Sequence, residues 1–472
     1  MSEILTPDLC VIGAGSAGLS VAAAAAAFGV PVVLIEQDKM GGECLNSGCV
    51  PSKALLAAAK HAHALRAASP FGIAASQPRI DFSKVHAHVH GVIAAIAPND
   101  SVERFTGLGV RVIRGSARFT DRRTAAVDNF QIKARRFVVA TGSSPTVPAI
   151  PGLDEVSYLT NETVFDLAEC PRRLLVLGAG PIGLELAQAF RRLGAEVVVL
   201  EAAAPLAKED PECAAVVLEA LAREGIEIRT GTKVVQASTG AGIKLALEGP
   251  RGADTLEGSH LLVATGRRAN IEGLGLDAAH IRHGPAGVSV NKRLKTSNRH
   301  VYAIGDVTGA PQFTHVANYH AGVVIRNALF RLPASVERDA LPWVTYTDPE
   351  LAHVGLTESE AGKRGRIGGL RWPYQENDRA QTERETKGHI KVVTSRRGRI
   401  LGATMVGAQA GELIAPWCLA VQQGLNIRAF AQSVLPYPTL GEIGKRAALT
   451  YFAPAAAKPW VRRVIALLRQ FG

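Results

Sequence analysis

The chain has 472 residues, 47% of them hydrophobic and 20% charged, with a formal net charge of +11. This length exceeds what one hydrophobic core usually serves, so about three domains are expected, and the composition excludes a disordered chain. The positive charge could attract a polyanion, but no basic stripe is interleaved with aromatic residues, so we expect no nucleic-acid partner.

An uncharged run covers residues 10–35 and is long enough for a membrane helix. Its glycines divide it into strand, loop, helix and strand, so we expect no membrane span. No Lys or Arg precedes Lys39, which argues against a signal peptide and for a cytoplasmic location. Six cysteines in so long a chain fit a reducing compartment rather than a disulfide scaffold.

The first predicted strand, Leu9–Ile12, leads into a glycine-rich turn and an Ala-rich helix that ends near Gly29. The next strand begins at Pro31 and ends on Glu36. This is the dinucleotide-binding fingerprint, whose three glycines allow a tight turn, an approach of the backbone to a pyrophosphate, and close packing of helix on strand. The helix start attracts phosphate, and Glu36 can accept hydrogen bonds from ribose hydroxyls. The three glycines are Gly13, Gly15 and Gly18.

The next stretch, GGECLNSGCVPSK, holds two cysteines, Cys44 and Cys49. Their spacing fits neither a zinc knuckle nor a thioredoxin-type motif, and we expect no metal site. A helix is predicted from Ser52 to Ala68, and a helix start beside Lys53 favours the reactive thiolate. We therefore predict a redox-active pair. The four isolated cysteines are expected to be inert: Cys10, Cys170, Cys213 and Cys418.

The fingerprint then recurs. A strand at Arg173–Leu177, a helix to about Leu193 and a strand at Glu196–Leu200 ending on Glu201 repeat the first unit at the same spacing. Two such units predict two bound dinucleotides. Glu201 would repel a 2′-phosphate, which favours NAD(H) over NADP(H). The glycines of this unit are Gly178, Gly180 and Gly183.

Two shorter segments also repeat, each after an apolar strand: the Ala-Thr-Gly runs that end at Gly142 and Gly266. Small residues there would let the chain pass close to a cofactor or cross between domains. Asp306 follows a third apolar strand, where it could either bind a polyol hydroxyl or cap a turn.

These motifs, in order GAGSAGLS, GGECLNSGCVPSK, GSARF, VATGS, GAGPIGLE, VATGRRAN, YAIGDV and YTDPELAHVGLTE, resemble those of the pyridine nucleotide-disulfide oxidoreductases. That family includes dihydrolipoamide dehydrogenase, glutathione reductase and mercuric reductase. The resemblance implies an α/β fold with two Rossmann-type dinucleotide-binding domains and a C-terminal α+β dimerisation domain. The expected domains are an FAD-binding domain at 1–150 and 271–340, an NAD(P)-binding domain at 151–270, a dimerisation domain at 341–455 and a basic tail at 456–472.

The resemblance also implies roles for individual residues. Cys49 would be the thiol beside the flavin and Cys44 the interchange thiol that meets the substrate, while Lys53 and Glu185 pair near flavin N5. Hydride would pass from NADH to FAD, and two electrons would then pass to the disulfide and on to an acceptor. The implied FAD site comprises Gly13, Gly15, Gly18, Glu36, Gly42, Lys53, Ala117, Gly142, Asp306 and Thr314. The implied NAD site comprises Gly178, Gly180, Gly183, Glu201, Val234 and Gly266.

Three residues depart from the family pattern or bear on a departure. Tyr437 stands where disulfide-reducing members carry a His acid/base, although the neighbouring Glu442 remains. A phenol, with a pKa of about 10, is a poor base at neutral pH. Glu43 replaces a Thr common in the family, and the sequence offers no reason for it. The C-terminal third resembles the interface domain of the family. By that resemblance, Tyr437 and Glu442 would complete the site of the partner subunit in a homodimer.

Mercuric reductases resemble this chain in having Tyr at that place, yet no cysteine follows Cys418 to hand over a metal ion. We therefore favour an NAD(P)H-dependent reductase of a small-molecule disulfide, similar to dihydrolipoamide dehydrogenase. The alternatives are a mercuric or other metal-ion reductase and a membrane-surface flavoprotein that reduces a quinone or a protein partner.

The chain ends in KPWVRRVIALLRQFG, residues 458–472, which has apolar residues near one helical face and arginines elsewhere. A basic amphipathic helix of this kind either lies weakly on an anionic membrane or packs on its own dimer.

Overall fold

The computed structural model describes residues 3–74, 77–240, 242–309, 311–456 and 458–471. They form two compact units. The first comprises Met1–Ala202 and Ile228–Val336, and the second comprises Ala203–Glu227 and Glu337–Gly472. The expected finer division into an FAD-binding, an NAD(P)-binding and a dimerisation domain stays a prediction, and the structure groups Ala203–Glu227 with the C-terminal part of the chain.

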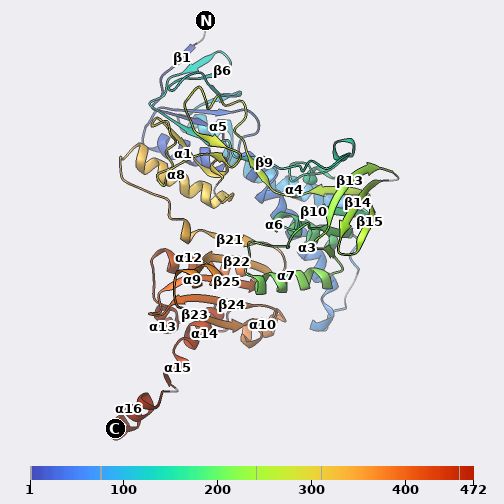
Figure 1. The fold of residues 1–472 in the computed structure, drawn as a ribbon, viewed down its shortest axis with the longest axis vertical. Helices are drawn as coiled ribbons and strands as arrows, with labels where there is room; N and C mark the ends of the chain where they lie inside the picture. Colours follow the sequence, from blue (N-terminus) through green and yellow to red (C-terminus); the bar gives the residue numbers. More distant parts are fainter. Residues whose placement is uncertain (1–2, 75–76, 241, 310, 457, 472) are drawn as a thin grey trace. The chain divides into compact units, whose positions relative to one another are not determined.

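The first unit contains a five-stranded parallel sheet in the order β20-β8-β2-β3-β4. Every residue of β2 and β3 is buried, as expected for central strands of a parallel sheet covered on both faces. Helices α1 and α8 lie side by side over one face (Figure 1) and share a core with it. The strands are β20 (Val301–Ala303), β8 (Arg136–Val139), β2 (Leu9–Ile12), β3 (Val32–Glu36) and β4 (Arg111–Arg114), and the helices are α1 (Ser16–Ala27) and α8 (Thr314–Ala328).

A second sheet in the same unit repeats this plan in the order β12-β11-β10-β16. Its strands are β12 (Glu227–Arg229), β11 (Glu196–Leu200), β10 (Arg173–Leu177) and β16 (His260–Val263), and helix α6 (Pro181–Arg192) follows β10. An antiparallel sheet, labelled in Figure 1, shares a core with it: β13 (Lys233–Thr239), β14 (Ile243–Gly249) and β15 (Gly252–Gly258). A short antiparallel ribbon pairs β9 (Ser143–Pro145) with β17 (Arg267–Ala269).

The remaining elements of the first unit are short strands and the helices around the cysteines. Strands β1 (Glu3–Leu5), β7 (Phe130–Ile132), β6 (Ala125–Val127) and β5 (Arg118–Phe119) form a four-stranded sheet. The helices are α2 (Gly42–Asn46), α3 (Cys49–Arg66), α4 (Phe82–Ile96) and α5 (Val102–Gly107), and β18 (His283–Gly284) pairs with β19 (Gly287–Val288).

The second unit is built on a five-stranded antiparallel sheet in the order β21-β22-β25-β24-β23. Its core is centred on the buried side chains of Trp417 and Tyr374. The strands are β21 (Pro342–Thr345), β22 (Glu350–Gly355), β25 (Ile400–Gly407), β24 (His389–Ser395) and β23 (Ile367–Pro373). The helices are α7 (Pro211–Arg223), α9 (Glu358–Arg364), α10 (Asp378–Glu383), α11 (Ala410–Leu413), α12 (Ala415–Gln422), α13 (Arg428–Gln432), α14 (Glu442–Thr450), α15 (Ala453–Ala456) and α16 (Pro459–Leu468).

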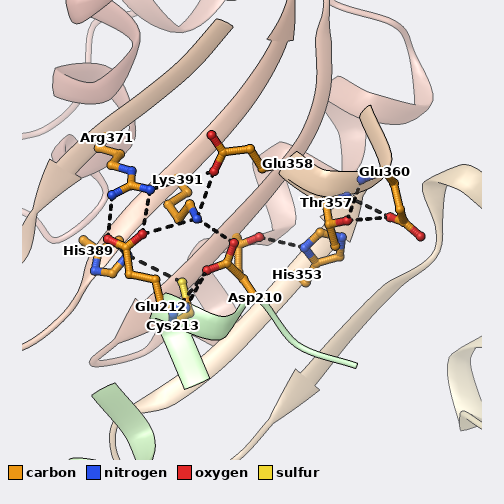
Figure 2. A network of polar contacts seen from close by, with 11 residues as sticks. Asp210, Glu212, Cys213, His353, Thr357, Glu358, Glu360, Arg371, His389 and Lys391 are labelled. Atoms are coloured by element: carbon orange, nitrogen blue, oxygen red, sulfur yellow. Dashed lines mark hydrogen bonds and ion pairs between the residues drawn. The ribbon is translucent and has the colours of Figure 1, made fainter. Parts of the chain in front are cut away.

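A buried ion-pair cluster explains why residues 203–227 group with this sheet (Figure 2). Lys391 of β24 lies 2.6 Å from Asp210, 3.1 Å from Glu358 and 3.4 Å from Glu212, and its side chain is only 9% exposed. Asp210 also caps α7 by accepting hydrogen bonds from the backbone of Glu212 and Cys213. Burial alone would lower the pKa of Lys391, but the hydrogen bonds to Asp210 and Glu358 outweigh it and raise the pKa. The cluster therefore fastens the start of α7 to the sheet.

The C-terminal tail forms helix α16, whose apolar side chains are exposed in the single chain. The last residue of the predicted tail, Gly472, lies outside the described residues. Among the helices that the structure describes, none is both long and apolar enough to cross a bilayer.

Candidate active site

The turn between β2 and α1 is built around Gly13. Its φ is +104°, and a Cβ added there would lie 2.4 Å from the carbonyl oxygen of Ala140, so only glycine fits. Glu36, at the end of β3, accepts hydrogen bonds from the backbone N–H groups of Ala14 (2.5 Å) and Asp38 (2.8 Å). The acid of the fingerprint thus braces the turn that precedes α1.

The second fingerprint repeats this geometry. Gly178 has a φ of +108°, and a Cβ there would lie 2.5 Å from the carbonyl oxygen of Ala264. Glu201 accepts a hydrogen bond from the N–H of Ala179 at 2.9 Å, the counterpart of the bond from Ala14 to Glu36. The duplication predicted from sequence spacing is therefore present in three dimensions. Val234 lies in β13, and Gly266 immediately precedes β17.

Both turns leave room for a phosphate at the start of the following helix. Gly15 caps α1 and Gly180 caps α6. A Cβ on Gly15 would meet nothing closer than 3.9 Å, and a Cβ on Gly180 nothing within 4 Å. Because helix N-termini offer free N–H groups and partial positive charge, the residues present fit the pyrophosphates of two dinucleotides.

The cysteine segment packs directly against the first of these turns. Gly41 pairs with Gly15 in an isolated parallel bridge, and a Cβ on Gly42 would lie 2.7 Å from the Cα of Gly15. Cys44 follows within α2, and Cys49 is the first residue of α3. The structure therefore brings the predicted thiol pair next to the predicted dinucleotide loop.

Several polar groups surround the two thiols, which are both free. The Thr314 hydroxyl lies 3.5 Å from Cys49 Sγ. One turn along α3, Lys53 forms the predicted ion pair with Glu185, with 2.8 Å between Nζ and Oε2, and the Glu185 side chain is only 6% exposed. The structure thus gathers four of the predicted site residues from α3, α6 and α8.

The pKa values of the two thiols are shifted in opposite directions. A hydrogen bond from the Cys44 thiol, helped by Thr314 and Lys53 and opposed by burial, lowers the pKa of Cys49 to about 5. The same hydrogen bond, together with burial, raises the pKa of Cys44. The reduced pair therefore holds one thiolate, on Cys49, and one proton, on Cys44. By contrast, burial raises the pKa of the fully buried Cys10 and Cys213, as expected for inert thiols.

Sequence reasoning missed a polar network beside this pair. Glu43 accepts two hydrogen bonds from Arg267, at 2.6 and 2.5 Å, and one from Asn161 at 2.7 Å. The same guanidinium donates to Ser143, whose hydroxyl donates to Asp306 at 2.6 Å. Arg267 directly follows Gly266 in the VATGRRAN motif, which was the only signal in the sequence. The predicted residue Ala117 is buried in the core behind the first sheet.

The last two predicted site residues lie in the second unit. Tyr437 is 68% exposed and donates a hydrogen bond to Asp378 at 2.7 Å. This bond, with the charge of Asp378, raises the pKa of the phenol, so Tyr437 is held as a donor rather than a base. Glu442 is the first residue of α14. Across the described residues, no cluster of three or more His, Cys, Asp or Glu side chains could hold a metal ion.

Two dinucleotide-type folds beside a polarised thiol pair define a redox protein that couples nicotinamide and thiol chemistry. Residues 7–321 match the pyridine nucleotide-disulphide oxidoreductase family, and residues 341–448 match the dimerisation domain of that family. The chain belongs to this family of FAD-dependent, NAD(P)H-linked oxidoreductases, for which FAD and NAD(H) are typical, and the dimerisation domain supports a homodimer.

Its relatives carry more than one name. The chain is 38% identical to a mercuric reductase of Streptomyces lividans, over 95% of this chain and 97% of that protein. It is also 38% identical to a dihydrolipoyl dehydrogenase of Thermus scotoductus, over 93% of this chain and 95% of that protein. Among solved structures, the Cu(II) complex of an HOCl-induced flavoprotein disulfide reductase from Escherichia coli matches with a TM-score of 0.85 and 26% identity, over 94% of this chain and 99% of that one.

Proposed function

We propose that this enzyme passes two electrons from NADH through FAD to the pair Cys44 and Cys49, and from there to a small-molecule disulfide. The observation that carries the proposal is the polarisation of the thiols. Cys49 begins α3 with a pKa lowered to about 5, between Thr314 and the Lys53–Glu185 ion pair. A thiolate held beside a dinucleotide loop is what electron transfer to or from a flavin requires.

The first glycine-rich turn is assigned to FAD and the second to the nicotinamide cofactor. Support comes from Gly41 and Gly42, which bring the cysteine segment onto the first turn. When bound, FAD would supply the two-electron chemistry that links hydride from the nicotinamide cofactor to the cysteine disulfide. Asp306 and Thr314 would hold FAD from the side of α8, and Glu36 would orient the ribose through the turn that it braces.

The protein's own residues carry the remaining steps. Two electrons and one proton break the S–S bond and leave a Cys49 thiolate and a Cys44 thiol. Cys44 loses its proton to the medium and attacks one sulfur of the acceptor, which releases one acceptor thiolate and leaves a mixed disulfide. The Cys49 thiolate then attacks Cys44 Sγ, which re-forms the protein disulfide and releases the second acceptor thiolate.

The acceptor class rests on Tyr437. In the homodimer, Tyr437 and Glu442 of one subunit would serve the thiol pair of the other. A phenol whose hydrogen bond to Asp378 raises its pKa does not remove protons at pH 7. We therefore assign a lipoamide-like disulfide, turned over slowly at neutral pH.

The test is the initial rate of NAD⁺ reduction by dihydrolipoamide, measured for the FAD-loaded enzyme and for Tyr437→His. Since a positioned imidazole base contributes about a hundredfold, the variant should be faster at pH 7 by roughly tenfold or more. Equal rates would remove Tyr437 from the acid/base position. If neither protein turns over although NADH reduces the flavin, the acceptor is of another class.

Reduction of a metal ion is the second candidate function. It is favoured by the presence of Tyr rather than His at position 437 and by the 38% identity to a mercuric reductase. Hg(II)-dependent oxidation of the nicotinamide cofactor, in the presence of excess small thiol, tests it. A rate well above that of dihydrolipoamide would replace the first candidate.

For the C-terminal tail, residues 456–472, we propose weak contact with an anionic membrane surface. Helix α16 exposes Trp460 and Leu468, each by more than 60%, and residues 458–472 contain four basic residues and no acidic one. The dimerisation-domain match ends at residue 448, before this helix. Full-length protein should sediment with phosphatidylglycerol vesicles but not with phosphatidylcholine vesicles, and a chain ending before Lys458 should sediment with neither. A tail that packs on its own dimer would instead leave vesicle binding absent throughout.

A further inference from the structure

Glu43 lies one residue before the interchange thiol and takes part in a forked ion pair. Arg267 donates from Nη1 to one carboxylate oxygen at 2.6 Å and from Nη2 to the other at 2.5 Å. Asn161 adds a third hydrogen bond at 2.7 Å. The Arg267 side chain is 11% exposed and that of Glu43 is 30% exposed. Such bidentate pairs fix geometry as well as charge, and all three partners of the carboxylate are donors.

The pair joins the cysteine helix to the ribbon of β9 and β17. Arg267 opens β17, and besides Glu43 it holds the hydroxyl (2.9 Å) and the carbonyl oxygen (2.8 Å) of Ser143 in β9. Glu43 belongs to α2, and Asn161 also contacts the carbonyl oxygen of Ser47, just beyond α2. The position of α2, and with it the position of Cys44, is therefore fastened by Glu43.

The charges around Glu43 do not cancel. Arg267 faces two carboxylates, Glu43 at 2.5 Å and Asp306 at 3.9 Å. The other ionisable groups that act on Glu43 are Asp306 and Cys49, and Glu43 in turn acts on Cys44. Burial raises the pKa of both carboxyl groups. When both are ionised, two acids face one guanidinium and leave an excess negative charge beside the thiols. A nearby negative charge disfavours a further anion, so it opposes ionisation of Cys44.

We propose that Glu43 is a positioning residue of the redox site, which anchors α2 through Arg267 and holds negative charge beside Cys44, so that Cys44 keeps its proton. This inference rests on the proposed electron path through the cysteine pair. It accounts for an acid where the family commonly has Thr, since a hydroxyl can neither neutralise Arg267 nor repel a second thiolate. Burial, opposed by Arg267, raises the pKa of Glu43 to about 7, so the charge is present at pH 8 and largely absent at pH 6.

The test follows alkylation of Cys44 by iodoacetamide in the reduced, FAD-loaded protein, with peptide mass spectrometry at pH 6 and pH 8. Glu43→Gln keeps the shape of the side chain but removes its charge. Because a lost neighbouring charge corresponds to about one pKa unit, Cys44 should react roughly tenfold faster than in the native protein at pH 8. At pH 6 the two rates should converge, a pH dependence that a purely structural change would not produce.

Two further variants keep the test decisive. Glu162→Gln removes an exposed charge next to Asn161 and should leave the Cys44 rate unchanged at both pH values. Glu43→Thr, with the residue common in the family, should behave like Glu43→Gln and replaces it if that variant loses FAD. An unchanged rate in both Glu43 variants at pH 8 would overturn the inference while leaving the electron path untouched. Turnover that survives loss of Cys44 itself would overturn the path instead.

Discussion

The two glycine-rich turns of this enzyme use the same backbone device for different purposes. Gly13 and Gly178 adopt nearly the same φ, +104° and +108°, and each passes too close to a carbonyl oxygen for any side chain. In both, an acid at the end of the next strand accepts a hydrogen bond from the residue after the first glycine: Ala14 to Glu36, and Ala179 to Glu201. The same fingerprint spacing therefore produces the same turn, with the same bracing acid, in both units.

What differs is the chain that covers each turn. The segment Gly41–Gly42 pairs with Gly15 and carries Cys44 and Cys49 with it, whereas among the described residues the corresponding Gly180 forms no bridge of this kind. A covered turn suits a cofactor that stays bound next to the reacting sulfurs. An open one suits a cofactor that enters and leaves on every turnover. The comparison teaches that the cysteine segment, rather than the dinucleotide fold, distinguishes the two sites.

The largest effect should come from removing either sulfur. Cys44→Ser or Cys49→Ser removes one reacting sulfur and leaves both glycine-rich turns intact, so both cofactors should still bind and NADH should still bleach the flavin. Disulfide turnover should fall by about a thousandfold or more, because the thiolate is the nucleophile. Steady-state rates and flavin absorbance check this, and undiminished turnover in either variant would remove the cysteines from the path.

The next largest effect concerns the first glycine of each turn. Gly13→Ala and Gly178→Ala each force a Cβ within about 2.5 Å of a backbone oxygen at positive φ, which should cost about 3 kcal/mol or more. The first should lower FAD content and the second should lower NADH binding with FAD retained. Flavin absorbance and NADH titration separate the two.

A matched control for this pair is Gly180→Ala, where a Cβ meets open space. It should leave the thermal unfolding temperature within a degree or two of the native value, while raising the KM for NADH because the Cβ stands where a pyrophosphate would approach. Equal destabilisation by Gly178→Ala and Gly180→Ala would contradict the assigned geometry.

A smaller effect is expected at the acid of the second turn. Glu201→Ala removes an acceptor for ribose hydroxyls and a repulsive charge toward a 2′-phosphate. The ratio of kcat/KM for NADH to that for NADPH should therefore fall by about tenfold. Kinetics with both cofactors measure it, and an unchanged ratio would show that another residue sets the preference.

The smallest effect is a shift in the acidity of Cys49. The hydrogen bond from Cys44 lowers the pKa of Cys49 and Lys53 adds to this effect, so this sulfur should be ionised at neutral pH. Since a positive charge favours the thiolate, Lys53→Met should raise the pKa of Cys49 by about one unit. The ¹³C chemical shift of labelled cysteine, followed against pH, reports it. Lys60→Met, an exposed lysine on the same helix, should leave the titration unchanged.

Much of this fold could be read from local patterns. Strands β2 and β10 run over the predicted residues, and α3 (Cys49–Arg66) covers most of the helix predicted from Ser52 to Ala68 but begins three residues earlier. The glycine spacing, the apolar runs and the terminal acids are all contained within short segments, so each predicts its own structure. The Lys53–Glu185 pair was also expected, but only because the family motifs implied it.

What the sequence could not supply are partners that lie far apart along the chain. Glu43 looked out of place because Arg267, its counter-ion, comes 224 residues later. The grouping of Ala203–Glu227 with the C-terminal unit depends on Lys391, 181 residues beyond Asp210. In the same way, Tyr437 donates its hydrogen bond to Asp378, which lies 59 residues earlier in the chain. Such pairs arise from tertiary packing, which neither periodicity nor spacing reveals.

The most direct test of the electron path is an anaerobic titration of the oxidised, FAD-loaded enzyme with NADH, with new thiols located by alkylation and mass spectrometry. We predict that oxidation of one NADH per subunit creates two alkylatable thiols, at Cys44 and Cys49, before the flavin stays reduced. Oxidation of NADH with full bleaching of the flavin and no new thiol at either cysteine would contradict it.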